Sequence, residues 1–283
     1  MVTARAGLVL VAVVAVAGVM MAGCSTNPAT GERQLKLIST QQEIAMGLEA
    51  APTFEQEFKG PVPDEQVQAY VRRVGQRVAA HSERDMPYDF TLLRSSVPNA
   101  FALPGGKVYI TDGLLQVMGS ERELAAVLGH ETGHVAAEHN VQGMQRQMGA
   151  SVLADLAGAA VGGAAGKATK VATQVTTGMV NLKYGRGDEY EADQLGVRYI
   201  AKAGYNPWGV VEMLNSLAEV SGGGGGGQLG EMLSTHPLTQ NRIADAERIV
   251  QTEYPQARRD EGPGDAKEFL AIREAAKKYM VQQ

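Results

Sequence analysis

Cysteine occurs once in the 283 residues, so the chain cannot form an intramolecular disulfide bond. Basic residues are not in excess either, because 26 Lys and Arg stand against 31 Asp and Glu, a formal net charge of −5. We therefore expect no nucleic-acid partner. No internal repeat is evident, and a hydrophobic content of 44% is typical of a globular chain with core enough for one fair-sized domain.

Charged side chains are nearly missing from the start of the chain. Arg5 precedes an uncharged apolar run over residues 6–23, which is too short for a comfortable membrane span. This pattern predicts a signal peptide over residues 1–23. Its removal leaves 25 basic and 31 acidic residues, a net charge of −6.

The apolar run ends at Cys24. The residues Met21-Ala22-Gly23-Cys24 resemble the lipobox of bacterial lipoproteins, in which the cysteine is lipidated and becomes the mature N-terminus. We therefore predict Cys24 as a lipidation site and residues 24–38 as a lipidated tether. Ser25 follows, rather than the Asp linked to inner-membrane retention, which favours the periplasmic face of the outer membrane. A plain secretory signal with an incidental cysteine is the alternative.

The mature chain is predicted to be a domain over residues 39–255 with a C-terminal helical tail over 256–283 packed on it. Thr40 to Glu43 has the form of a capping box that starts a helix reaching about residue 58. A second helix begins at Asp64, and its apolar stripe is expected in the core. That stripe comprises Val67, Tyr70, Val71, Val74 and Val78.

Two segments have strand composition, residues 88–94 and 107–111. The segment between them has Pro98 and Pro104 and two adjacent glycines, which argue against a central, fully paired strand. An exposed edge is the interpretation we favour, and it could bind an extended peptide through main-chain hydrogen bonds. A simple hairpin connection is the alternative.

Two glycine-rich stretches interrupt the second half of the chain. Residues 149–167 are rich in Ala, Gly and Val, and we expect a closely packed helix there rather than a membrane segment. Residues 222–227 are six glycines in a row, which predicts a flexible loop. That loop could let the following segment move as a lid; a neutral linker is the alternative.

The sequence His130-Glu131-Thr132-Gly133-His134 carries the clearest chemistry. On a helix, residues four apart share a face, so both imidazoles can bind one metal ion with Glu131 beside it. Zinc suits this arrangement because it accepts imidazole nitrogen and activates a bound water. Capping at Ser120 and apolar residues at helical spacing predict that the motif lies on a helix. An amphipathic helix with two exposed histidines is the alternative.

Catalytic zinc sites usually have three protein ligands. Glu189 and Asp193 are four apart on a helix predicted over residues 188–203, and hence on one face. Glu189 can therefore bind the metal while Asp193 accepts a hydrogen bond from a ligand histidine. The alternative is a solvated acidic start of a helix. His81 and His139 are expected to be structural or surface residues, with His139 around the helix from the metal face.

Motifs in a fixed order along the chain extend this pattern. The chain resembles the zinc metallopeptidases of the HtpX, BepA and CAAX-prenyl-protease type, members of the gluzincin group, and in particular their periplasmic lipoprotein branch. The resemblance spans roughly residues 25–250. It rests on residues 27–31 (NPATG), 99–106 (NAFALPGG), 130–134 (HETGH), 189–193 (EYEAD) with Gly196, 203–207 (AGYNP) and 235–238 (THPL).

The resemblance assigns a role to each matching residue. It implies that His130, His134 and Glu189 hold one zinc ion per chain, that Glu131 is the general base and later the proton donor, and that Asp193 supports a ligand. Asn99 and Ala100 would lie on the strand that binds the substrate backbone. His236 would stabilise the oxyanion, or close over the metal as a fourth ligand, and Arg242 matches a position near the active site.

These observations predict an α+β fold, mainly helical, in which the edge strand of a small sheet flanks the active-site helix. The predicted function is a membrane-tethered zinc endopeptidase that cleaves unfolded or misassembled envelope polypeptides in the periplasm. The alternative is a chaperone-like assembly factor whose metal site is mostly latent and gated by His236. A purely structural zinc site fits poorly, because such sites commonly use four ligands with cysteine. The tetratricopeptide repeats of BepA-like relatives and the membrane spans of HtpX-like relatives are not expected.

Overall fold

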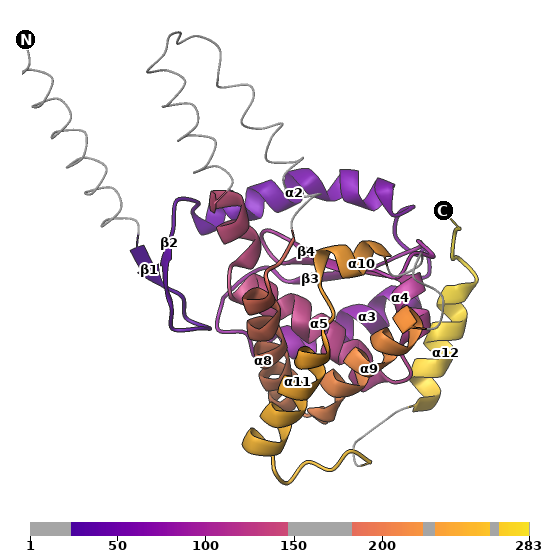
Figure 1. Ribbon diagram of the computed structural model, residues 1–283. Helices are drawn as coiled ribbons and strands as arrows, with labels where there is room; N and C mark the ends of the chain where they lie inside the picture. Colours follow the sequence, from indigo (N-terminus) through magenta and orange to yellow (C-terminus); the bar gives the residue numbers. More distant parts are fainter. Residues whose placement is uncertain (1–23, 147–182, 223–229, 261–265, 283) are drawn as a thin grey trace, which may run out of the picture.

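The computed structural model describes residues 24–146, 183–222, 230–260 and 266–282. The signal peptide predicted over 1–23, the segment 149–167 and all but the first residue of the glycine run lie outside the described residues. The fold is α+β and mainly helical, as predicted (Figure 1). Helices whose two ends lie within the described residues include α2 (Thr40–Glu57), α3 (Glu65–Ala79), α4 (Asp112–Val117), α5 (Glu121–Ala136), α8 (Arg186–Lys202), α9 (Trp208–Gly222), α10 (Gly230–Thr235), α11 (Gln240–Glu253) and α12 (Ala266–Lys277).

The larger sheet has three strands in the order β3 (Asp89–Leu93), β5 (Lys107–Thr111) and β4 (Ala100–Leu103). β3 runs parallel to β5, whereas β4 pairs with it antiparallel, with Ala100 opposite Ile110 and Leu103 opposite Lys107. Within the described chain β4 is thus an edge strand, and it contacts α5. This confirms the prediction that an edge strand flanks the helix bearing the histidine motif.

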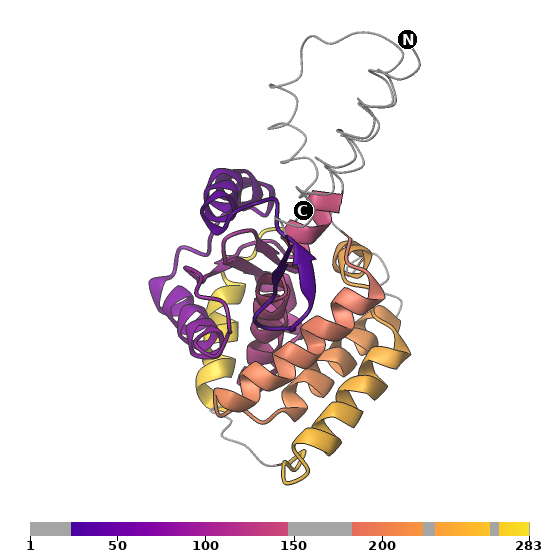
Figure 2. The same cartoon turned by 90° about the vertical axis from the view of Figure 1, so that its left-hand side faces the viewer.

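Helix α5 lies at the centre of the domain, and nearly all of it is buried. In Figure 2, α2 and α3 lie on one side of it and α8 and α11 on the other. The contact with α8 depends on small residues, since a Cβ on Gly133 would lie 2.9 Å from the carbonyl oxygen of Ala192. The close approach of these two helices brings the histidine motif next to the acidic residues of α8.

The first two helices begin close to the predicted positions. The N-cap of α2 is Ser39, whose side chain forms a reciprocal capping box with Gln42, so the box lies one residue earlier than predicted. Glu43, expected in the box, is instead buried. Asp64 caps α3 as predicted, and the apolar stripe of α3 is at most 1% exposed. Both helices are therefore positioned by local capping and by one buried face.

The expected tether contains a short antiparallel hairpin of β1 (Cys24–Thr26) and β2 (Arg33–Leu35). Asn27 is buried in its turn, and its side-chain amide donates to the carbonyl of Ala136 at the end of α5, at 3.0 Å. Gln34 donates to the next carbonyl, that of Ala137, also at 3.0 Å. The hairpin thus supplies donors to carbonyl groups that a helix end leaves without intrahelical partners.

A buried ion pair also supports this end of α5. The guanidinium of Arg84 binds Glu43 of α2 at 2.7 Å, lies 3.4 Å from Glu138, and donates to the carbonyl of Val135 at 2.7 Å. We expect Arg84→Met to lower the free energy of unfolding by about 3–5 kcal/mol, because it leaves the buried carboxylate of Glu43 without a cation, whereas Glu138 keeps Lys36 at 3.2 Å. Urea denaturation of the two proteins measures this; a change below about 1 kcal/mol would contradict it.

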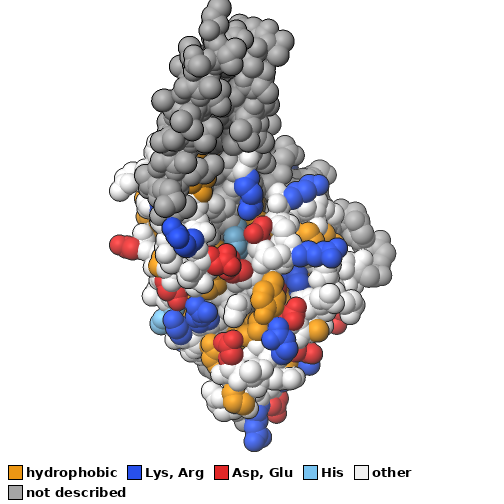
Figure 3. Space-filling view, turned by 60° about the vertical axis from the view of Figure 1, so that its left-hand side comes forward, with side chains coloured by type: hydrophobic (Ala, Val, Ile, Leu, Met, Phe, Trp, Pro, Cys, Tyr) orange, Lys and Arg blue, Asp and Glu red, His pale blue; other side chains and the backbone are white. Residues whose placement is uncertain are grey.

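The C-terminal segment contains α12, which packs against α3 and α4 and buries Phe269, Ile272 and Ala276. None of the helices in the described ranges is long and apolar enough to cross a membrane. On the face shown in Figure 3, Lys and Arg side chains are interspersed with Asp and Glu, without a continuous basic patch.

Candidate metal centre

The histidine motif lies on α5, as its spacing predicts. Ser120 caps this helix by accepting from the N–H of Glu123, and the helix then runs without interruption through both histidines. The Nε2 atoms of His130 and His134 are 3.0 Å apart, and their rings meet edge to face. Both side chains are buried. Two imidazoles whose nitrogens converge in this way can bind the same ion.

Helix α8 adds a carboxylate to this pair. Glu189 is fully buried, and its two oxygens lie 3.4 Å from Nε2 of His134 and 3.5 Å from Nε2 of His130. Burial by itself would raise the pKa of Glu189, but the imidazoles of His236, His130 and His134 outweigh burial and hold the pKa well below its ordinary value. This group is therefore ionised, as a metal ligand must be.

A third histidine completes the cluster. His236 follows α10, and its Nδ1 lies 3.0 Å from Glu189 Oε1 and 3.4 Å from His130 Nε2. Ligand atoms of His130, His134, Glu189 and His236 all lie within 4.8 Å of one another, and all four residues are buried. Three imidazoles and one carboxylate form a donor set that suits zinc. The residues therefore fit a metal ion, with His236 at the position of a fourth ligand.

A layer of charged residues surrounds the cluster. Asp193 Oδ1 lies 2.9 Å from Nδ1 of His130, as expected for a residue that supports a ligand. Arg242 binds Asp193 through two contacts of 2.7 and 2.8 Å and approaches Glu189 at 2.5 Å. Burial would raise the pKa of Asp193, but Arg242 outweighs burial and lowers it. Arg242 thus holds both carboxylates in place, a role that the sequence did not specify.

The charged residues around the cluster are expected to contribute to metal affinity. We expect Asp193→Asn to weaken metal affinity about 10- to 100-fold, because the amide cannot replace the carboxylate that binds both His130 and Arg242. Competition with a chromogenic chelator measures the affinity. Asp245→Asn on α11 is the matched control, since Asp245 contacts Arg248 outside the cluster. Equal affinities for the two variants would contradict the role of Asp193.

Glu131 lies on α5 beside the cluster and is not one of the four residues whose ligand atoms converge. It is fully buried, and neither of its carboxylate oxygens has a hydrogen-bond partner among the described residues. Nε2 of His236 lies 3.8 Å from its Oε1. Burial raises the pKa of Glu131, although His236 and His130 oppose the effect. A buried carboxylate without partners is costly, so a structural role alone does not explain it.

Three neighbours of the cluster were missed or misplaced by the sequence analysis. His139 was expected around the helix from the metal face, but its Nδ1 lies 2.8 Å from Nδ1 of His134. The reason is that α5 ends at Ala136 and Glu138 adopts a positive φ of 63°, which turns the chain back. Tyr184 stacks on His134 at 3.8 Å between ring centroids. Its hydroxyl donates to the side chain of Asn140.

The remaining predicted residues, Asn99, Ala100 and Cys24, are not among the four residues of the cluster. Asn99 precedes β4, and Ala100 is its first residue; Asn99 lines the same cavity as His236, and both Asn99 and Ala100 are buried. Cys24 is the first residue of β1 and is not part of the metal cluster.

A buried His-Glu-His motif with a downstream Glu on a neighbouring helix defines the class of gluzincin-type metallopeptidases. The family model of peptidase family M48 matches residues 65–250, and the chain belongs to this family. This confirms the resemblance seen in the sequence. The family, together with relatives that are named metalloproteases, supports a metalloendopeptidase.

Several curated proteins are similar to the chain. The beta-barrel assembly-enhancing protease of Yersinia pestis is 28% identical over 223 residues, covering 74% of this chain and 44% of that protein. The putative beta-barrel assembly-enhancing protease of Vibrio cholerae is 33% identical over 69% of this chain and 41% of its own length. The mitochondrial metalloendopeptidase OMA1 of Schizosaccharomyces pombe is 32% identical, covering 63% and 51%. The chain spans about half the length of these relatives.

Proposed function

We propose that the protein is a zinc-dependent endopeptidase of the cell envelope, with zinc held by His130, His134 and Glu189. Glu131 carries this proposal. Its carboxylate is buried beside the metal ligands without a partner among the described residues, and its pKa is raised. A structural metal site needs ligands but no such group, whereas hydrolysis needs a base at this position.

Zinc, when bound, supplies Lewis acidity toward the scissile carbonyl. The protein's own side chains transfer the proton and position the metal ligands. Glu131 takes a proton from the attacking water and then delivers it to the amine that leaves. Asp193 fixes the ring orientation of His130 through Nδ1, and Arg242 keeps Asp193 ionised and forms an ion pair with Glu189. Burial of all these groups strengthens their electrostatic effect on the reacting atoms.

The sheet edge supports a polypeptide substrate. Ala100 begins an edge strand whose outer side faces the cavity that His236 also lines. A peptide added to this edge binds through main-chain hydrogen bonds, which a folded protein cannot offer because its own backbone groups are paired. We infer that Ala100 binds the substrate backbone through its main-chain groups, that Asn99, which lines the cavity, contacts it through its side chain, and that the substrates are unfolded or misassembled polypeptides. Relatives named for the assembly of beta-barrels favour envelope proteins as the source.

The position of His236 favours a second function at the same site. Its Nδ1 lies among the ligand atoms of the other three residues, so with zinc bound it would take the place that a catalytic site leaves open. We infer that this arrangement is a closed resting state and that the segment carrying His236 withdraws before substrate is cleaved. If it rarely withdraws, the protein acts mainly as a binding or assembly factor with a latent metal site.

The lipid anchor is the part of the proposal that locates the enzyme. We infer that Cys24 is lipidated after removal of residues 1–23 and holds the domain on the periplasmic face of the outer membrane. We expect Cys24→Ser to release the protein from washed membranes into the soluble periplasmic fraction without loss of peptidase activity. Fractionation followed by immunoblotting measures this. Retention of the variant on membranes to the wild-type extent would contradict the anchor.

The substrate class is tested by comparing two substrates for the purified full chain. We expect cleavage of casein, which has little stable structure, and no cleavage of a tightly folded protein of similar size until it is unfolded by reduction or heat. Equal cleavage of the folded and the unfolded form would contradict recognition through an added strand.

A further inference from the structure

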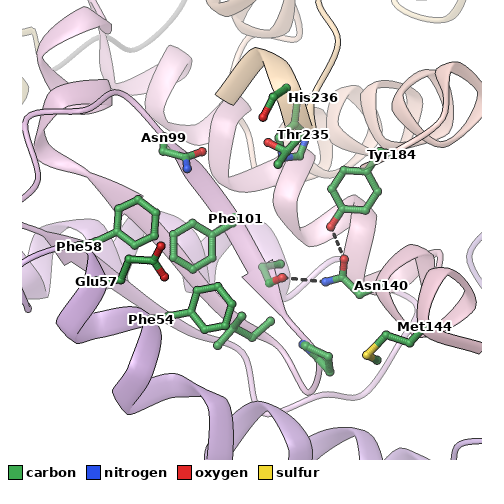
Figure 4. Close-up of a pocket in the computed structure, with 14 residues that line it drawn as sticks. Phe54, Glu57, Phe58, Asn99, Phe101, Asn140, Met144, Tyr184, Thr235 and His236 are labelled. Carbon is green, nitrogen blue, oxygen red and sulfur yellow. Dashed lines mark hydrogen bonds between the residues drawn. The ribbon is translucent and has the colours of Figure 1, made fainter. Parts of the chain in front are cut away.

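A cavity of about 110 Å³ is lined by residues of β4 and reaches His236 of the metal cluster. Thr235 and His236 lie at one end, and the aromatic side chains of Phe54, Phe58 and Phe101 gather at the other (Figure 4). Phe54 lies on α2, and Phe58 is the C-cap residue that follows this helix. A substrate strand on the edge of β4 would pass these rings.

The pairing of β4 with β5 determines which of its main-chain groups face this cavity. The N–H of Thr111 donates to the carbonyl of Asn99, and Phe101 lies opposite Tyr109 in the pairing of β4 with β5. Main-chain groups alternate in direction along an antiparallel strand. Asn99 and Phe101 therefore direct their main-chain groups to β5, whereas Ala100 and Ala102 direct theirs outward, where a substrate strand would bind.

Asn140 already forms a hydrogen bond with one of these outward-facing main-chain groups. Its side-chain amide donates to the carbonyl of Ala102 at 2.7 Å and accepts from the hydroxyl of Tyr184 (Figure 4). Asn140 is 5% exposed and Tyr184 8% exposed, so this pair is a buried part of the cavity wall. A substrate strand can therefore pair with Ala100 and extend past Phe101, but it must leave the edge at Ala102.

The substrate residue opposite Phe101 would form a pair with Phe101 that has no main-chain hydrogen bonds. Residues directly opposite in a sheet point their side chains to the same face, and at a pair without main-chain hydrogen bonds they approach most closely, at about 4.5 Å between Cα atoms. On this face the ring of Phe101 lies 5.5 Å from that of Phe54, 5.0 Å from that of Phe58 and 5.2 Å from that of Tyr109. The rings form an apolar wall for that side chain.

We propose that Phe54, Phe58 and Phe101 form a specificity pocket for a bulky apolar side chain, best an aromatic one, on the substrate residue opposite Phe101. Glu57 lines the same cavity from the exposed side of α2, so an acidic side chain is disfavoured there. This inference rests on the proposed peptidase function. It adds that cleavage sites share one apolar position, although the main-chain contacts are indifferent to sequence.

The test uses the full chain purified in detergent. A peptide library is cleaved, and the sites are mapped by mass spectrometry. We expect one position on one side of the cleaved bond to be enriched in Phe, Tyr, Leu and Met and depleted in Asp and Glu. Matched fluorogenic peptides with Phe, Ala or Glu at that position then give kcat/KM values, with Phe over Ala at about tenfold or more.

Variants assign the preference to the pocket. Phe101→Ala should bring the Phe-to-Ala ratio of kcat/KM close to one, and Phe58→Leu should lower it with less risk to the fold. Glu57→Gln should raise kcat/KM for the Glu peptide without changing the Phe-to-Ala ratio. Leu48→Ala is the matched control, because Leu48 lies on the same helix, is 57% exposed and does not line the cavity.

The outcomes separate this inference from the proposed function. If the wild type cleaves peptides with no preference at any position, or if Phe101→Ala and Phe58→Leu both keep the preference with intact melting curves, the pocket assignment is wrong and the peptidase function stands. If the wild type cleaves neither the peptides nor casein, with zinc bound and after His236→Ala, the proposed function itself fails.

Discussion

Glu131→Gln is expected to leave the zinc content at one ion per chain and to lower casein cleavage at least a hundredfold. The amide has nearly the shape of the carboxylate but cannot accept a proton from water, and general-base catalysis typically contributes about 10²–10⁴-fold. The ligands are untouched, because Glu131 contributes no atom to the cluster of His130, His134, Glu189 and His236. Metal analysis and cleavage assays on the same preparation measure both quantities.

The stability of this variant is a second readout. A buried carboxylate without partners among the described residues destabilises the fold, so Glu131→Gln should melt at the same temperature as the wild type or higher. Glu121→Gln is a useful comparison, since Glu121 lies on the same helix but accepts hydrogen bonds from Tyr70 and Tyr205. Cleavage by Glu131→Gln at the wild-type rate would show that this residue is not the base.

His236→Ala is expected to raise casein cleavage while zinc remains bound through the other three ligands. Nδ1 of His236 lies 3.0 Å from Glu189 Oε1 among the converging ligand atoms, and in the closed state that we propose substrate reaches the metal only when this residue withdraws. Removing the side chain removes the competition. A tenfold rise would mean that the closed arrangement is favoured over the open one by about 1.4 kcal/mol.

A fall in cleavage with His236→Ala would assign this residue a different role. If His236→Ala lowers kcat with zinc content unchanged, His236 stabilises the transition state instead of closing the site, and a loss of about 10²–10³-fold is typical for such a group. His236→Gln distinguishes the two roles further, since an amide can donate a hydrogen bond to an oxyanion but is a poor zinc ligand. A rise with His236→Ala and with His236→Gln supports closure; a fall with Ala that Gln partly restores contradicts it.

The sequence predicted those parts of the site that depend on local periodicity. The four-residue spacing of His130 and His134, and of Glu189 and Asp193, places each pair on one face of a helix, and the structure has both pairs on such faces. The edge position of β4 was predicted from two prolines and paired glycines. These signals are contained in a few neighbouring residues, so one sequence is enough to read them.

Contacts between distant segments could not be predicted in this way. His139 meets His134 because the chain reverses after α5 through a positive φ at Glu138, for which the sequence has no glycine signal. Tyr184 and Asn140 are 44 residues apart, and neither belongs to a spacing pattern. Arg242 was matched to a family position, but its bonds to Glu189 and Asp193 depend on how α11 packs on α8.

The dependence of peptidase activity on zinc is tested by casein cleavage with one preparation of the full chain, measured before chelation, after removal of the metal, and after addition of one equivalent of zinc. We predict one zinc ion per chain at the start, loss of cleavage with loss of the metal, and recovery with stoichiometric zinc. Cleavage that persists in protein shown to be free of metal would contradict zinc-dependent catalysis.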